Sequence, residues 1–105
     1  MSEIIYNKLI RDKIPEIIEN TGKSFKTRML NDEEYVKELY KKLNEEVAEF
    51  NEDNEIKELC DIVEVIHAIL KARGVTESDF ENQRLEKLKA RGGFDKKIFL
   101  ESVEK

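Results

Sequence analysis

Residues 45–61 read Glu-Glu-Val-Ala-Glu-Phe-Asn-Glu-Asp-Asn-Glu-Ile-Lys-Glu-Leu-Cys-Asp, and this stretch gives the strongest indication of the fold. It contains two acidic pairs, each spaced three residues apart: Glu46 with Glu49, and Glu58 with Asp61. Residues three apart on a helix point the same way. The pairs are symmetric about Asp53-Asn54, a dipeptide typical of turns. The stretch therefore predicts a helical hairpin in which Glu46 faces Asp61 and Glu49 faces Glu58.

These acidic residues share helix faces with apolar residues. Glu46 lies on a stripe with Leu39, Leu43, Val47 and Phe50, and the second pair shares a face with Ile62, Val65, Ile66 and Ile69. Because the chain is 41% charged, one acidic pair at helical spacing is most often just a solvated face. Carboxylates on an apolar face are uncommon unless they are paired or bind a metal. The pattern therefore favours a Mg²⁺ site, with Mn²⁺ as the alternative ion, and its predicted ligands are Glu46, Glu49, Glu58 and Asp61.

Length and composition limit the architecture and the partners. We expect 105 residues to form one domain, spanning 1–105. With 39% hydrophobic residues, so small a helical chain is not expected to bury enough apolar surface alone, which predicts a homodimer or a dimer of dimers. The net charge of −5 argues against a stable nucleic-acid complex and against binding to an anionic membrane.

Two single residues bear on location and chemistry. Cys60 is the only cysteine, which fits a reducing cytoplasm, and no signal peptide or apolar run of transmembrane length is present. Cys60 is more often a small packing residue than a nucleophile in such a setting, because no base accompanies it. His67, the only histidine, is better explained as a packed or interface residue than as a metal ligand.

Apolar periodicity and capping residues predict an all-α helical bundle built on an antiparallel hairpin. We expect a short helix capped by Asp12 and stopped at Gly22, and a long helix capped by Asn31 or Asp32 that runs to about residue 52. The next helix spans about 55–73, and Thr76 caps a further helix to about residue 90. Segments 24–30 and 97–100 predict an optional small two-stranded β element.

Two basic clusters flank the acidic core. The first lies near the amino terminus and consists of Lys8, Arg11 and Lys13. The second surrounds Gly92-Gly93 and includes Lys89, Arg91, Lys96 and Lys97. Each cluster alone is a weak signal, because surface cations are usually just solvated. Beside a carboxylate-bound metal they complete what phosphoryl chemistry needs, since the metal and the cations share the phosphate charge. The predicted phosphate-binding residues are Lys8, Arg11, Lys13, Lys89 and Arg91.

These motifs resemble the MazG-like, all-α nucleoside triphosphate pyrophosphohydrolases. The likeness rests on Glu-Glu-x-x-Glu followed by Glu-x-x-Asp, here residues 45–49 and 58–61. The opening Tyr-Asn-Lys-Leu-Ile-Arg-Asp-Lys-Ile-Pro and the closing Arg-Gly-Gly-Phe resemble a phosphoribosyl-ATP pyrophosphohydrolase-like subgroup. The resemblance thus covers nearly the whole chain. One departure is that the gap between the two acidic halves is shorter than is usual in the superfamily.

The resemblance implies hydrolysis of a nucleoside triphosphate between the α and β phosphates, which yields the monophosphate and pyrophosphate. It also implies Mg²⁺ held by the four predicted ligands and assembly through helix packing. Glu45 or Glu49 would orient the attacking water as the catalytic carboxylate.

Three functions remain open at the level of sequence. The first is house-cleaning hydrolysis of a non-standard or excess nucleoside triphosphate. The second is a biosynthetic phosphoribosyl-ATP pyrophosphohydrolase. The third is a catalytically silent helical dimer that binds a nucleotide or a protein. Base selectivity depends on the shape of a pocket formed between segments or subunits, so the sequence does not name the base.

Overall fold

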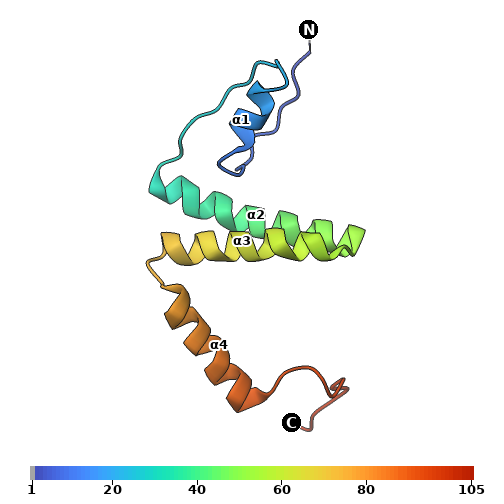
Figure 1. Ribbon diagram of the computed structural model, residues 1–105. Coiled ribbons are helices and arrows are strands. Elements are labelled where there is room, and N and C mark those ends of the chain that lie inside the picture. Colours follow the sequence, from blue (N-terminus) through green and yellow to red (C-terminus); the bar gives the residue numbers. More distant parts are fainter. Residues whose placement is uncertain (1) are drawn as a thin grey trace. The chain divides into compact units, whose positions relative to one another are not determined.

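The computed structural model describes residues 2–105 and confirms the all-α prediction. Its four helices, shown in Figure 1, are α1 (Ile14–Glu19), α2 (Asp32–Asp53), α3 (Ile56–Ala72) and α4 (Glu77–Arg91). The helices divide between two compact units, one running to Gly74 and one from Val75 to Lys105. The first unit holds α1, α2 and α3, and the second holds α4 and the carboxyl-terminal segment. None of the helices in 2–105 is long and apolar enough to cross a membrane.

The central hairpin forms where the acidic pairs predicted it. Helices α2 and α3 lie side by side in opposite directions, joined by a very short turn (Figure 1). Asn54 adopts the left-handed conformation there, with φ of 56°, and its N–H donates a hydrogen bond of 2.7 Å to the Phe50 carbonyl. Asparagine tolerates this conformation better than most residues. The turn at Asp53-Asn54 is therefore confirmed.

Two of the predicted caps are confirmed. The Asn31 side chain accepts a hydrogen bond of 2.8 Å from the Glu34 N–H, and the Glu34 carboxylate reaches back to the Asn31 N–H. This reciprocal capping box satisfies two backbone donors at the start of α2. At the start of α4, the Thr76 hydroxyl accepts a hydrogen bond of 3.1 Å from the Asp79 N–H. The sequence thus predicts both helix starts correctly.

The prediction that Asp12 caps the first helix is wrong. Helix α1 begins after Lys13, which makes no side-chain cap. The Ile14 N–H instead donates to the Arg11 carbonyl at 3.1 Å, so the backbone itself takes a donor that a cap would otherwise satisfy. Pro15 lies in the first turn as expected, where its missing N–H has no consequence.

The predicted β element is also wrong. Residues 24–30 and 97–100 are neither helix nor strand, and no strand occurs anywhere in 2–105. A strand needs a partner for its backbone groups, and alternation in so short a segment supplies none. Met29 and Phe99 are almost fully exposed, so no apolar face of either segment packs against a sheet neighbour.

The outer face of α3 is unusually apolar for a surface. Ile56, Cys60, Val63 and His67 recur at helical spacing and are all exposed, with Ile56 at 74% and Val63 at 48%. Cys60, which was expected to be a small packing residue, is exposed in the single chain and lies on this outer stripe. Buried apolar residues in the described chain are few, namely Leu39 and Val65. A surface of this kind is typical of helix faces that pack against another subunit.

We therefore expect the protein to form a dimer or larger assembly through this stripe. Val63→Glu should shift it toward monomer and lower its melting temperature, because an unpaired charge in an apolar interface is costly. Analytical ultracentrifugation of the wild type and the variant measures the change. Met29→Glu is the control, since Met29 is exposed and lies outside the stripe. A stable, folded wild-type monomer at micromolar concentration would contradict the prediction.

Candidate metal centre

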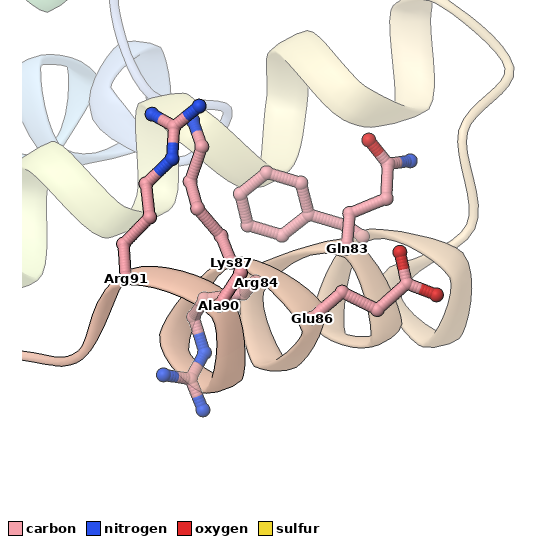
Figure 2. A pocket seen from close by; sticks show the side chains of 7 residues that line it. Gln83, Arg84, Glu86, Lys87, Ala90 and Arg91 are labelled. Carbon is pink, nitrogen blue, oxygen red and sulfur yellow. The ribbon is translucent and has the colours of Figure 1, made fainter.

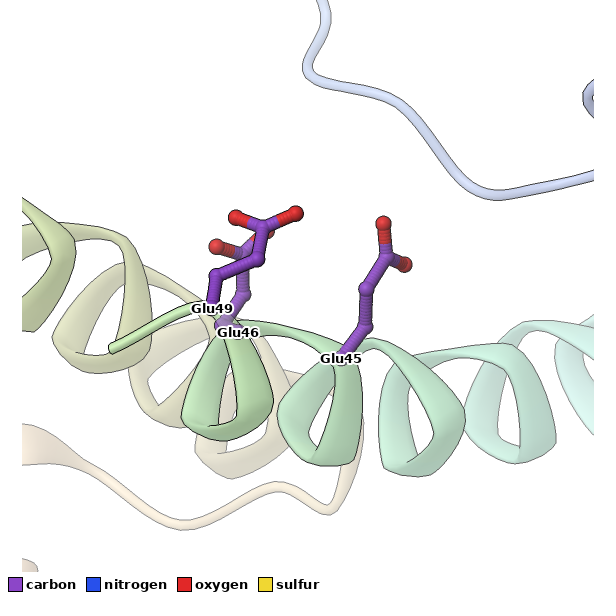
Figure 3. Close-up of side chains that lie close together, drawn as sticks. All are labelled: Glu45, Glu46 and Glu49. Atoms are coloured by element: carbon purple, nitrogen blue, oxygen red, sulfur yellow. The ribbon is translucent and has the colours of Figure 1, made fainter. Parts of the chain in front are cut away.

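Five carboxylates gather on one side of the hairpin. Helix α2 supplies Glu45, Glu46 and Glu49, which extend toward the same side of the helix in Figure 3. Oxygens of these three lie within 4.8 Å of one another, and so do oxygens of Glu46, Glu58 and Asp61. Glu46 belongs to both groups and links the two helices. We call these five residues the acidic cluster.

The structure adds one detail to the predicted pairing. Oxygens of Glu46 and Asp61 lie close together, as the symmetry of the two acidic pairs about the turn requires. None of the four predicted ligands points away from the cluster into bulk solvent. Glu49 groups with Glu45 and Glu46 of its own helix, and its charge also helps to raise the pKa of Glu58, the residue that it was predicted to face. Glu46 is the residue that belongs to both groups of oxygens. Glu46 therefore takes the central position that the sequence assigned equally to all four.

Burial makes this cluster unlike a solvated acidic face. Glu46 is only 7% exposed and Glu58 only 8%, although α3 leaves several apolar residues in solvent. The Oε2 atom of Glu46 is buried and has no hydrogen-bond partner. Buried polar atoms almost always find a partner, and an ionised carboxylate without one is costly. The arrangement thus leaves one buried carboxylate oxygen without a hydrogen-bond donor from the protein.

Burial and like charge shift the pKa values of the two inner carboxylates. Burial is the main reason that the pKa of Glu46 lies above its usual range, and the charge of Glu49 adds to the effect. Burial likewise raises the pKa of Glu58, with further contributions from Asp53, Glu49 and Asp61. Lys42 acts in the opposite direction on Glu46. Both inner carboxylates are therefore destabilised as anions when only protein groups surround them.

Basic side chains from the amino-terminal segment contact the rim of the cluster. The Lys8 ammonium donates to Glu45 at 3.1 Å, and the Arg11 guanidinium donates to Asp61 at 2.5 Å. The prediction placed these two residues on phosphates, whereas here they bind carboxylates. The third residue of that group, Lys13, lines a cavity next to the cluster. All three residues of the first basic cluster thus lie beside the acidic one.

Sequence reasoning missed a fourth cation, Lys42. Its ammonium lies 3.4 Å from Glu46 and 3.6 Å from Glu45. The signal was present, because a lysine four residues before a glutamate on one helix is an ordinary pairing distance. Lys8, Arg11 and Lys42 form ion pairs with the cluster, so three cations balance only part of the charge of its five carboxylates.

Glu45 differs electrostatically from the inner carboxylates. Partial burial opposes its ionisation, yet the hydrogen bond from Lys8 and the charges of Lys42 and Lys8 lower its pKa below the usual range. The hydrogen bond to Glu45 and the charge of Glu45 in turn raise the pKa of Lys8. A carboxylate held ionised in this way accepts a hydrogen bond well but is a weak proton acceptor.

The second basic cluster belongs to the other unit. Arg91 lines a hollow of about 540 Å³ along α4 together with Phe80 and Lys87. Figure 2 shows the Lys87 and Arg91 side chains extending from the same side of the helix. Lys89 does not line this hollow. That Lys89 and Arg91 hold phosphates stays a prediction.

The raised pKa values predict the pH dependence of stability in the absence of metal. A carboxyl group whose pKa is higher in the folded state binds its proton more tightly when folded. Its stabilising contribution is present below the ordinary glutamate pKa and is lost as pH rises through the raised pKa of Glu46 and Glu58. The metal-free protein should therefore melt at a higher temperature near pH 5 than at pH 7. Circular dichroism melts in chelator measure this.

Glu46→Gln tests the assignment of that pH dependence. The substitution removes one of the two titrating groups, so the rise in melting temperature toward pH 5 should be smaller. Glu52→Gln, an exposed position on the same helix, should leave the rise unchanged. A wild-type melting temperature that falls steadily from pH 7 to pH 5 would contradict the prediction. It would show that carboxylates with a lowered pKa, such as Glu45, control the pH dependence of stability instead.

Comparisons with known proteins add one partial similarity. Neither a family model nor a solved structure matches the chain. Over 42 residues the chain is 50% identical to an uncharacterized protein of Mycolicibacterium smegmatis. The matched stretch covers 40% of the chain and 43% of that protein. Because the name of this relative states no activity, the similarity assigns no function.

Proposed function

We propose that the protein is a Mg²⁺-dependent nucleoside triphosphate pyrophosphohydrolase of the MazG-like type. The reaction adds water to the α phosphorus and breaks its bond to the bridging oxygen, so that a nucleoside monophosphate and pyrophosphate leave. The observation that carries the proposal is the buried, unpartnered Oε2 atom of Glu46 at the centre of five carboxylates. An oxygen-rich, negatively charged site of this kind suits a hard divalent cation.

The donor set fits such an ion. Glu46, Glu58 and Asp61 would hold it, and Glu49, which lies on α2, would be the fourth ligand. A bound Mg²⁺ would supply charge neutralisation for the phosphate oxygens and Lewis acidity toward the phosphorus and the water. The fit rests on the chemistry of the oxygens and on the orphaned atom of Glu46, and both are independent of the family resemblance.

The remaining chain groups have separate tasks. Glu45 or Glu49 accepts a hydrogen bond from the attacking water and so orients it toward the phosphorus. Lys8 and Arg11 stand at the rim, where they pair with Glu45 and Asp61. When a cation takes over the carboxylate charge, these two side chains are available for the phosphate oxygens. Lys8 and Arg11 thus pair with the carboxylates before the substrate binds and with the phosphates afterwards.

A product assay tests the proposal directly. A panel of nucleoside triphosphates, including non-standard ones and phosphoribosyl-ATP, is incubated with the protein and Mg²⁺, and pyrophosphate and orthophosphate are measured separately. We expect pyrophosphate as the product, and no activity in excess chelator, because a triphosphate and five carboxylates repel each other without cations. Orthophosphate as the first product would exclude cleavage between the α and β phosphates. Absence of turnover across the panel would favour a silent binding module.

A further inference from the structure

A cavity of about 380 Å³ adjoins the acidic cluster in the first unit. One wall is the amino-terminal segment 9–13, and the others are α2 and α3. Glu46 and Asp61 line the cavity and also belong to the acidic cluster. Whatever fills this cavity is therefore in contact with two of the proposed metal ligands.

The cavity changes character along the hairpin. On α2 it is lined at helical spacing by Tyr35, Leu39, Lys42 and Glu46, which form one face. The helical rise of about 1.5 Å per residue puts Tyr35 about 16 Å from Glu46 along the axis. Ala68 of α3 also lines the cavity, and in an antiparallel hairpin it lies at the level of Leu39. One end is thus aromatic and apolar, and the other end is acidic.

A nucleotide, like this cavity, is largely apolar at one end and charged at the other. Its base is flat and largely apolar, and its phosphates require cations. Aromatic side chains stack on bases of every kind, and Tyr35 supplies such a ring at the apolar end. Arg11 and Lys13 line the wall formed by the amino-terminal segment, and their positive charges suit the sugar-phosphate part of a nucleotide. The volume lies near the lower end of the range for small-molecule sites, which suits one nucleoside.

We propose that this cavity binds the nucleoside part of the substrate, with the base beside Tyr35, Leu39 and Ala68 and the triphosphate directed to Glu46 and Asp61. The inference rests on the proposed function, and it also names the substrate class. A mononucleoside triphosphate has one base and one sugar to place in this volume. We expect phosphoribosyl-ATP, which carries a second sugar phosphate on its base, to be the poorer substrate.

Filling the apolar end tests the assignment. Ala68→Phe should raise the KM for every nucleoside triphosphate that the wild type cleaves by about tenfold or more, because the added ring occupies the space of the base. Cleavage of inorganic tripolyphosphate, which has no base, should be unchanged. Ala72→Phe is the matched control, since Ala72 is exposed on the same helix and does not line the cavity. Circular dichroism verifies that each variant is folded.

Tyr35 gives a second test that leaves the packing of α3 alone. Tyr35→Ala should raise the same KM, Tyr35→Phe should restore it, and Tyr40→Ala, at an exposed tyrosine outside the cavity, should have no effect. Nucleoside monophosphates titrated into the protein with Mg²⁺ by calorimetry give a readout without turnover. Weaker binding to Ala68→Phe and Tyr35→Ala supports the site even if the wild type hydrolyses nothing, which would overturn only the proposed reaction. Turnover with a KM unchanged in both variants would overturn the nucleoside site and leave the reaction standing.

Discussion

Glu46→Gln is expected to lower the rate of pyrophosphate release by about a hundredfold or more, on the scale of lost electrostatic stabilisation of a transition state. Glu46 is the residue that both groups of carboxylates share, so its loss removes a ligand from α2 and the link to α3. Glutamine keeps the size of the side chain but lacks the negative charge that binds a cation. The pyrophosphate assay with saturating Mg²⁺ measures the change in kcat.

The matched control for this variant is Glu52→Gln. Glu52 lies on the same helix, is exposed and stands outside the acidic cluster, so its replacement should leave kcat within about twofold, as is usual for surface changes. Asp61→Asn should resemble Glu46→Gln, because Asp61 belongs to the second group of carboxylates together with Glu46. Equal turnover by the wild type and both cluster variants would refute a metal-assisted mechanism at this site.

Divalent cations should reverse the order of melting temperatures of the wild type and Glu46→Gln. In chelator, Glu46→Gln should melt at or above the temperature of the wild type, because the buried, unpartnered carboxylate oxygen is gone. With Mn²⁺ or Mg²⁺ at about a hundred times its dissociation constant, the wild type should gain about 2.7 kcal/mol. For a domain of this size, that corresponds to about 10 °C or more. The variant should gain much less.

Thermal melts with and without metal, followed by circular dichroism, measure both rankings. Ca²⁺ is a useful comparison, because it accepts the same oxygen ligands with longer bonds and looser geometry. Glu52→Gln should follow the wild type in every condition. A wild-type melting temperature that does not respond to any divalent cation would rule out a specific metal site, whatever the activity assay shows.

The helices and their ends could be predicted from local sequence. A turn residue that tolerates the left-handed conformation stands at Asn54, and side-chain caps stand at Asn31 and Thr76. These features act within four residues of the chain, so no tertiary contact is needed to specify them. The first helix shows the limit of such reasoning. Asp12 is a good capping residue, but the Arg11 carbonyl accepts the Ile14 N–H and no side chain caps the helix.

The two segments predicted as strands failed for a related reason. Alternation of apolar residues describes a strand only when another strand accepts its hydrogen bonds. Residues 24–30 and 97–100 have the pattern but no partner, so they remain irregular. Helices satisfy their backbone groups internally, and for this reason the same kind of pattern was a safer guide for α2 and α3.

Helical period and turn position are local properties, so the hairpin and the side of it on which the carboxylates gather follow from the sequence alone. Which carboxylate is central depends on tertiary packing. The Oε2 atom of Glu46 is buried and has no hydrogen-bond partner, while Glu45 is paired with Lys8, and the two residues are adjacent in sequence. Their difference arises because the amino-terminal segment brings Lys8 and Arg11 across the hairpin from far away in the chain. Contacts at that sequence distance depend on packing, which no local pattern specifies.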